Sequence, residues 1–390
     1  VPFMQFGMSA MDAFFEAVSG ITTTGLTMLG DVSAAPAGLL FCRAWLQWIG
    51  GLGIVIISLV LIFPSGALAK DIGETEAIQD DLLGGVKTFA RQVLLIYLFL
   101  TLTGVVLLTA LGVTFTDALL YTFAAVSTGG FAPDTASAAG LQSVPAQVAV
   151  LVLAFSGALP MLVYIRLRQR SPIHRRETAQ ILGILFSAIL VAGIMILDNA
   201  LNPSRASSMS PYDLSWMAMS AQTTAGFSTL SAEHLGSASK IALMMAMSIG
   251  GGIGSTAGGF KIYHLLAVLH LMRTMVSRTQ LTPHAVLPVR IFGNPLDPPQ
   301  SHKLLLIPLL FAAVVGISWL IFGLHGYPAL DSLFDVVSAT GTVGLSTGTA
   351  SHRLPALLKL VLCADMLMGR LEFIAWLVVL SPNTWIGRRL

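Results

Sequence analysis

The chain has 390 residues, of which 55% are hydrophobic and 10% are charged, and its formal net charge is +2. Soluble domains carry roughly 25% charged residues, so this composition excludes an ordinary soluble domain and indicates a polytopic membrane protein. No basic patch is interleaved with exposed aromatic residues, so nothing indicates nucleic-acid binding. The two cysteines fall in expected membrane helices and the eight histidines lack metal-ligand spacing. Neither a disulfide framework nor a metal centre is therefore predicted.

One sixteen-residue pattern occurs four times along the chain. In every copy an Asp stands thirteen residues before a Gly, and Leu or Phe follows that Gly. The copies are Asp12–Thr27, Asp117–Ala132, Asp213–Ser228 and Asp331–Ser346. The last copy contains Thr342-Val343-Gly344, the start of the TVGYG signature of potassium-channel filters. Ordinary Gly/Thr turns between helices do not explain this fourfold recurrence, so the pattern favours a repeated pore unit.

The pattern has a physical interpretation as a short helix followed by an ion-binding loop. The residues after each Asp could form a helix of about 15 Å, half of a bilayer core, with the Asp expected as its N-cap. The negative end of the helix dipole would then point at the Gly-containing loop, whose carbonyls could replace the hydration shell of a cation. The expected filter residues are Thr23, Thr24, Gly25, Thr128, Gly129, Gly130, Thr224, Ala225, Gly226, Thr342, Val343 and Gly344.

Hydropathy divides the chain into four expected pore repeats, and the fold class is an all-α polytopic membrane protein. The repeats are residues 1–64, 65–171, 172–295 and 296–390, arranged as pseudo-fourfold helix–pore-loop–helix units around a central ion pore. The expected spans are Leu39–Phe63, Gln92–Leu111, Val144–Ile165, Ile181–Leu197, Leu304–Leu324 and Leu354–Leu380, with a broken span at Lys240–Met272. Repeat 1 lacks a membrane helix before its pore segment, and we expect that this helix has been cut off.

The distribution of basic residues predicts the orientation. Five Arg lie within residues 166–176, which places that loop in the cytoplasm by the positive-inside rule. The loops just after the expected filters are nearly free of Lys and Arg, so the filters are expected toward the outer face. Arg43 lies near the outer end of its span, where snorkelling or an ion pair is favoured over a role in the pore.

Several motifs resemble those of the TrkH/KtrB superfamily of bacterial potassium-uptake channels. Besides the four filter units, they are QWIGGLGIV (47–55), GGGIGSTAGGFK (250–261), AVLPVRIFG (285–293) and MLMGRLEF (366–373). The last three are more similar to the TrkH branch. The resemblance implies a pseudo-fourfold pore, a homodimer, and a cytosolic nucleotide-binding ring protein as regulator. It also implies one filter Gly per repeat, carried by Gly25, Gly130, Gly226 and Gly344. The leading helices of that branch are absent here.

A gate is expected beneath the filters. Six Gly within residues 250–259 will not hold a regular helix, because each costs roughly 1 kcal/mol relative to Ala. The positive charge of Arg370 would raise an electrostatic barrier to cations in a low-dielectric constriction. The alternatives are close helix packing by Gly and a buried ion pair at Arg370. The expected gate residues are Gly250, Gly251, Gly252, Gly254, Ser255, Thr256, Gly258, Gly259 and Arg370.

The function expected from these patterns and from the resemblance is potassium uptake across the bacterial cytoplasmic (inner) membrane, with K⁺ as the transported ion, Na⁺ as a second candidate and no organic cofactor. No nucleophile has an adjacent base, so an enzyme is not predicted. The stretch Gly252–Ala257 matches the loose dinucleotide fingerprint, but no βαβ unit surrounds it. The alternative is a Na⁺- or H⁺-coupled K⁺ symporter, since coupling generally needs a membrane-buried carboxylate. The candidates are Glu16, Asp198, Asp365 and Glu372, none of which lies beside a filter Gly in sequence. A membrane scaffold is a third hypothesis.

Overall fold

The computed structural model describes residues 2–62, 82–202, 209–279, 290–291, 294–295, 298–370 and 376, and these residues are almost entirely helical. In chain order the helices are η1 Pro2–Phe6, α1 Ala10–Ile21, α2 Ala37–Ile62, α4 Leu82–Ala110, α5 Phe115–Val126, η3 Ser137–Gly140, α6 Val144–Ala158, α7 Met161–Arg168, α8 Arg175–Leu201, α9 Pro211–Gln222, η5 Ala232–His234, α10 Ser237–Ile249, α11 Ile262–Thr279, α12 Pro298–Leu324, α13 Ala329–Thr340 and α14 Ala356–Arg370. Two short strands, β1 Arg290–Ile291 and β2 Asn294–Pro295, pair antiparallel. The expected all-α class is confirmed.

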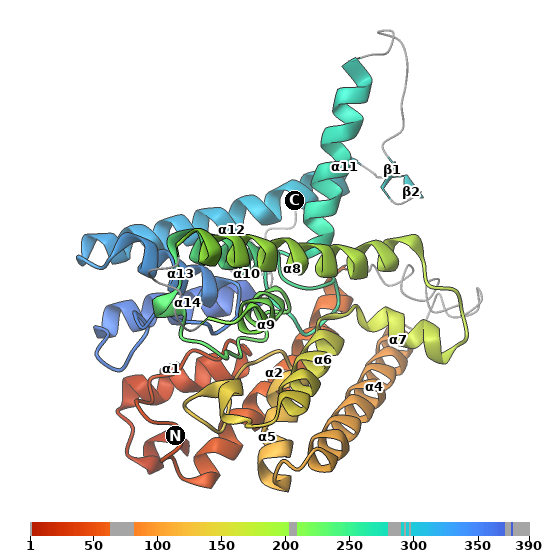
Figure 1. Ribbon diagram of the computed structural model, residues 1–390. Coiled ribbons are helices and arrows are strands. Elements are labelled where there is room, and N and C mark those ends of the chain that lie inside the picture. Colours follow the sequence, from red (N-terminus) through yellow and green to blue (C-terminus); the bar gives the residue numbers. More distant parts are fainter. Residues whose placement is uncertain are drawn as a thin grey trace, which may run out of the picture.

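The helices are arranged as four similar units, which we number 1 to 4 in chain order. Each unit has a twelve-residue helix (α1, α5, α9 or α13), which we call the pore helix after its expected role, followed by a loop and a second helix (α2, α6, α10 or α14). In units 2 to 4 a long helix (α4, α8 or α12) precedes and packs on the pore helix. Units 1 and 2, in red to yellow, form the lower half of the view in Figure 1, and units 3 and 4 form the upper half.

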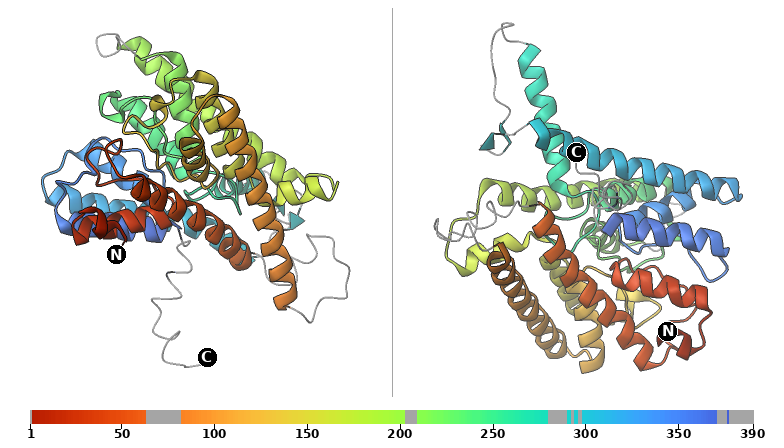
Figure 2. Two further views of the ribbon diagram at one scale, coloured as in Figure 1. Left: turned by 90° about the horizontal axis from the view of Figure 1, so that it is seen from below. Right: turned by 180° about the vertical axis from the view of Figure 1, so that it is seen from behind.

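The four units close into a ring. The second helix of each unit packs against the pore helix of the next: α2 on α5, α6 on α9, α10 on α13, and α14 on α1. The last of these contacts joins the fourth unit back to the first, and the view from behind in Figure 2 shows the blue α14 beside the red α1. The ring therefore closes although no long helix precedes α1 among the described residues.

The second helices share one register against their own pore helices. A Cβ on Gly50 of α2 would collide with the carbonyl oxygen of Ile21, the last residue of α1. Gly157 of α6 and Gly369 of α14 stand in the same way against Val126 and Thr340, the last residues of their pore helices. Each of these glycines is the fourteenth residue of its helix. Equivalent positions in the second helices can therefore be assigned by counting from the first residue of each helix.

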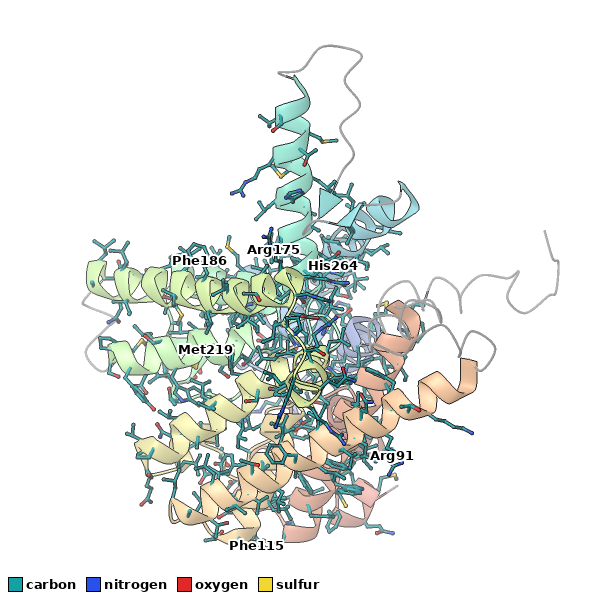
Figure 3. The ribbon with its side chains drawn as sticks, turned by 90° about the vertical axis from the view of Figure 1, so that its right-hand side faces the viewer. Arg91, Phe115, Arg175, Phe186, Met219 and His264 are labelled. Atoms are coloured by element: carbon teal, nitrogen blue, oxygen red, sulfur yellow. The ribbon has the colours of Figure 1, made fainter. Side chains whose placement is uncertain are left out.

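Four helices in the described part of the chain are long and apolar enough to cross a membrane, and a fifth span results if the bent pair α6 and α7 is counted as one. The four are Ala37–Ile57, Lys87–Ala110, Arg175–Leu201 and Leu304–Leu324. The outward faces of α4, α8 and α12 carry exposed apolar side chains, for example Phe99 and Phe186, which are 67% and 69% exposed. Figure 3 shows Phe186 pointing away from the other helices. Such faces suit contact with lipid acyl chains.

The expected span Val144–Ile165 is not one continuous helix, because the chain bends by 88° between α6 and α7. Pro160 lacks an N–H and disfavours a helical conformation for Leu159, so the helix ends at Ala158. The carbonyls released at this end do not stay unpaired. Those of Gly157 and Ala158 accept hydrogen bonds from the segment that follows α10. The expected break in the span after Ile249 is confirmed, since α10 ends there and α11 begins at Ile262.

Candidate functional site

The pore helices begin with a polar box, and the Asp of the repeated pattern is not its N-cap. In units 1 to 3 the N-cap is Ser9, Thr114 or Ser210, whose hydroxyl accepts from the backbone N–H of the Asp three residues later, at 3.1–3.3 Å. The same hydroxyl lies 2.7 Å from the Asp carboxylate. Unit 4 begins with Pro328 and has no side-chain cap. The expectation that Asp caps these helices is therefore wrong. At the third position the carboxylate accepts from the N-cap hydroxyl in units 1 to 3, and it still lies near the positive end of the helix dipole.

The loops after the four pore helices, which we call the candidate filter loops, share one backbone conformation. The threonine two positions before each pattern Gly has a φ of 49–54°, although side chains disfavour this left-handed region. The pattern Gly also has positive φ, between 70° and 95°. The residue between them does not, so the backbone alternates. Four copies of an unfavourable conformation at matched positions indicate that the surrounding structure imposes it.

The four pattern glycines lie against one another in a ring. A Cβ on Gly25 would collide with the carbonyl oxygen of Gly129, which precedes the Gly of unit 2. The other contacts repeat this relation around the ring: Gly130 with Ala225, Gly226 with Val343, and Gly344 with Thr24. Each loop thus packs its Gly on the backbone carbonyl of the next loop, and the fourth loop packs on the first. The structure brings all twelve expected filter residues together.

Glycine is required at these four positions for two independent reasons. Its φ lies in the left-handed region, and no space exists for a Cβ beside the neighbouring carbonyl. The glycines are also the partly exposed members of the loops, whereas the two residues before each are buried. The open end of the ring is therefore lined by backbone and not by side chains.

Buried carboxylates contact the segments after the glycines in units 1 and 4. Glu16 accepts from the Thr27 hydroxyl and from the backbone N–H of Met28 at 2.8 Å. Asp335 accepts from the backbone N–H groups of Thr347 and Ala350 at 2.8 and 2.7 Å. Both side chains are fully buried, and each lies four residues after the Asp of its pattern. Sequence reasoning weighed Glu16 only for ion coupling and did not consider Asp335, although their shared position in the pattern was visible.

Arg43 forms an ion pair, which is one of the two roles that the sequence favours for it. Its Nε lies 3.3 Å from the Glu16 carboxylate, and both side chains are buried. Its guanidinium also lies over the ring of Phe131, 3.9 Å from the centroid. Phe131 follows the pattern Gly of unit 2, so Arg43 links the pore helix of unit 1 to the loop of unit 2.

Two lysines join neighbouring units at the first turns of the pore helices. Lys240 of α10 lies 2.8 Å from Asp331 of unit 4, and Lys359 of α14 lies 2.6 Å from Asp12 of unit 1. Both lysines are the fourth residue of their helix, where α2 and α6 carry Leu40 and Gln147. Unit 4 is therefore bonded by ion pairs on both sides. This role for Lys359, a charged residue in the last expected span, was not predicted.

The segment Gly250–Gly259, which we call the glycine-rich loop, lies across the threonine side of the candidate filter loops. The Thr256 hydroxyl donates to the carbonyl of Gly157 at 2.9 Å, and the backbone N–H of Gly258 donates to the Thr224 hydroxyl at 2.7 Å. The N–H of Gly259 donates to the carbonyl of Gly341 at 3.1 Å. The loop thus contacts units 2 to 4. A Cβ on Gly258 would collide with Gly341, so this approach requires glycine.

Arg370 at the end of α14 binds the glycine-rich loop directly. Its Nη1 donates to the carbonyl of Thr256 at 2.7 Å, and the side chain is buried. Among the described residues no carboxylate forms an ion pair with Arg370, and its Nε and Nη2 have no partner there. Asp365, one turn earlier on α14, instead accepts from Ser318 at 2.7 Å. Glu372 lies outside the described residues. The structure therefore brings the nine expected gate residues together beneath the ring.

Comparison with known proteins identifies the family. The TrkH family, described as cation transport proteins, matches residues 4–385. The chain belongs to the TrkH family. It is 29% identical to an uncharacterized cation transporter of Methanocaldococcus jannaschii, over 96% of this chain and 76% of the relative. It is 27% identical to the Trk system potassium uptake protein TrkH of Escherichia coli, over 97% of this chain and 80% of the relative. The crystal structure of the potassium transporter TrkH from Vibrio parahaemolyticus has a TM-score of 0.81 and 26% identity, covering 97% of this chain and 80% of that one.

In this TrkH-family chain the carboxylates weighed for ion coupling lie in different places. Asp198 accepts from the Ser239 hydroxyl at 2.6 Å, near the first turn of α10. Asp365 lies between α12 and α14. Of the three that the structure describes, only Glu16 contacts a segment that adjoins a candidate filter loop. The loose dinucleotide fingerprint at Gly252–Ala257 lies within the glycine-rich loop, which follows helix α10 and not the strand that a dinucleotide-binding loop follows.

Proposed function

We propose that this TrkH-family chain conducts potassium into the cell through the ring of candidate filter loops. The observation that carries the proposal is the closed ring. In it, each pattern Gly packs on a backbone carbonyl of the next loop, the one that belongs to the residue just before that loop's own pattern Gly. Matched loops of this kind present backbone oxygens from four directions, and such oxygens can replace the water around a dehydrated cation. The relatives named as potassium uptake proteins support potassium as the ion. The chain is then a transporter with K⁺ as its cargo, and the four units are its pore repeats.

The pore helices support the same function electrostatically. All four end at a candidate filter loop, so the negative ends of their dipoles converge on the ring. An Asp in the first turn of each helix stabilises the opposite, positive end. The ring therefore favours a cation without placing a side-chain carboxylate in the path.

We propose that the glycine-rich loop and Arg370 form the gate of this pore. The loop lies on the threonine side of the ring, and its Thr256 carbonyl is bonded to the buried guanidinium. A fixed positive charge at that position opposes the passage of cations. Displacement of the loop would break the Arg370 bond together with several others, including those from Thr256 to Gly157 and from Gly258 to Thr224.

Ion flux in proteoliposomes tests the filter. Gly→Ser at position 25, 130, 226 or 344 adds a side chain where the next loop's carbonyl lies, so it should relax the preference for K⁺ over Na⁺. Reversal potentials with opposed K⁺ and Na⁺ gradients measure that preference. Gly112→Ser is the control, since Gly112 also has positive φ but no atom lies near its Cβ position. Unchanged selectivity in all four folded filter variants would reject the ring as the filter.

The gate has a separate test. Arg370→Ala should raise basal K⁺ flux and leave the K⁺/Na⁺ preference unchanged, because the barrier lies below the filter. Arg273→Ala on the exposed part of α11 is a matched control. Wild-type or lower flux in folded Arg370→Ala would exclude the gate. A lower yield of folded protein with no gain in flux would instead favour a structural role for Arg370.

The symporter alternative differs in its energetics. Uphill K⁺ movement driven by a pH or Na⁺ gradient alone would favour coupling, whereas downhill flux alone favours conduction.

The resemblance to TrkH proteins extends the proposal to a homodimer in a bacterial cytoplasmic membrane with a cytosolic nucleotide-binding ring protein as regulator. Size-exclusion chromatography with light scattering, with and without that class of partner, tests the assembly.

A further inference from the structure

The side chain of Gln47 on α2 contacts the candidate filter loop of the neighbouring unit. Gln47 is fully buried. Its Nε2 donates to the carbonyl of Gly129, and its Oε1 accepts from the backbone N–H of Phe131 at 3.1 Å. One group of the loop is an acceptor and the other is a donor, so a single orientation of the amide satisfies both. The carboxamide thus bonds the backbone on both sides of Gly130, as a neighbouring strand would.

The sequence of the loop is matched to this side chain. A Cβ on Gly129 would collide with the Gln47 carboxamide. The other three loops carry Thr24, Ala225 and Val343 at this position. Unit 2 therefore has no side chain at the place that the Gln47 side chain of unit 1 occupies.

The other second helices place no such group there. Gln47 is the eleventh residue of α2, and counting in the register fixed by Gly50, Gly157 and Gly369 identifies its equivalents in the other units. These equivalents are Ala154, Met247 and Met366. All three are apolar, so the contact belongs to the boundary between units 1 and 2 alone.

We infer that Gln47 is a positioning residue that sets ion discrimination through the Gly129 carbonyl; this inference rests on the proposed filter. The carbonyl has two lone pairs, and the Gln47 amide occupies one, so the other is fixed in direction. The donated hydrogen also weakens the negative field of that oxygen toward a cation. One of the four sides of the ring is consequently stiffer and less attractive than the others. A preference for K⁺ over the smaller Na⁺ depends on the number and field of the coordinating carbonyls.

The test replaces Gln47 by the residue that units 3 and 4 carry. Gln47→Met preserves the approximate volume and removes only the two polar contacts. The K⁺/Na⁺ permeability ratio, from reversal potentials in proteoliposomes, should fall by about five- to tenfold. Gln147→Met on α6 is the control, because Gln147 bonds Leu141 and Tyr212 and contacts no candidate filter loop. Its ratio should equal that of the wild type.

A double-variant cycle separates a direct contact from a general loss of packing. Gly129→Ala should reduce the ratio in the wild-type background, where its Cβ meets Gln47. It should reduce the ratio less in a Gln47→Ala background, where that space is free. Additive effects, or a folded Gln47→Met with the wild-type ratio, would overturn the inference. The cycle also provides the test if Gln47→Met does not fold.

Failure of this inference can be told apart from failure of the filter proposal. Gly344→Ser lies in unit 4, and Gly344 packs on the loop of unit 1 and not on that of unit 2. Relaxed selectivity in Gly344→Ser with an unchanged ratio in Gln47→Met would leave the filter in place and reject the role of Gln47. Unchanged selectivity in both variants, and in the other three glycine variants, would reject the filter itself.

Discussion

Units 1 and 4 bond the segment after their pattern Gly to a buried carboxylate, whereas units 2 and 3 use a hydroxyl. In unit 2 the Tyr121 hydroxyl donates to the carbonyl of Ser137 at 2.8 Å, and in unit 3 the Ser220 hydroxyl donates to that of Phe227 at 2.6 Å. Glu16 and Asp335 instead accept several bonds each. The pore helices of the two halves thus support these segments by different chemistry, since those of units 1 and 4 supply carboxylate acceptors and those of units 2 and 3 supply hydroxyl donors.

The difference extends to the glycines themselves. The N–H groups of Gly25 and Gly344 donate to the hydroxyls of Ser19 and Ser338, at 3.1 and 3.0 Å. The corresponding residue is Ala124 in unit 2 and Ser220 in unit 3, where the hydroxyl donates to the carbonyl of Phe227 instead. Units 4 and 1 are neighbours in the ring, since α14 packs on α1. All four loops of the ring therefore share one backbone conformation, whereas the buried carboxylates Glu16 and Asp335 lie in units 1 and 4, on one side of the ring. We call this arrangement two-sided. The variants below test this division, from the largest expected effect to the smallest.

Breaking the Glu16–Arg43 pair should have the largest effect. Both charges are buried, and removal of one partner from a buried pair costs about 3–5 kcal/mol because the other charge is left uncompensated. Arg43→Met should therefore greatly reduce the yield and the thermal unfolding temperature of detergent-purified protein, measured by fluorescence-detected size exclusion. Arg43→Met combined with Glu16→Gln should recover part of the loss. A single variant as stable as the wild type would show that the pair does not support unit 1.

Asp335→Ala should have the next largest effect, and it compares the two halves directly. It leaves the N–H groups of Thr347 and Ala350 without their partner, at about 1–3 kcal/mol for each buried group. Ser220→Ala in unit 3 frees one carbonyl and should cost less. The measurement is the unfolding temperature of both variants under the same conditions. Equal losses would mean that the carboxylate gives unit 4 no special support.

Lys240→Met tests the joint between units 3 and 4. Its partner Asp331 is 35% exposed, and partly exposed ion pairs contribute about 0–1 kcal/mol, an amount that salt reduces. We expect a small loss of unfolding temperature at low ionic strength that vanishes at high ionic strength. Gln147→Met, which replaces the residue at the equivalent position of α6, is the control and should show no salt dependence. A loss from Lys240→Met that is independent of salt would indicate packing of the lysine stem in place of the ion pair.

The repeated features of this molecule were predictable, and the features that differ between units were not. The Asp-to-Gly spacing predicted four pore helices and the loops after them, because it recurs with the period of the fold. The glycine content of residues 250–259 predicted the break after α10. The bend after Ala158 was missed because apolar residues continue through Leu159 and Pro160, so hydropathy alone shows one span. The partners of Gln47, Glu16 and Asp335 depend on how distant segments pack, which one sequence does not record.

Tyr121→Phe should have the smallest effect on the unfolding temperature among these variants, because unit 2 uses a hydroxyl where units 1 and 4 use a carboxylate. It removes a single neutral hydrogen bond, to the Ser137 carbonyl, and the ring of Tyr121 keeps its contact with Phe227, 6.0 Å away between centroids. A neutral hydrogen bond contributes about 1 kcal/mol net, so the unfolding temperature should fall by only a few degrees. The K⁺/Na⁺ ratio should not change, because the Ser137 carbonyl lies seven residues beyond Gly130. A loss as large as that of Asp335→Ala would show that donor and acceptor chemistry support the ring equally, and the two-sided description would then be wrong.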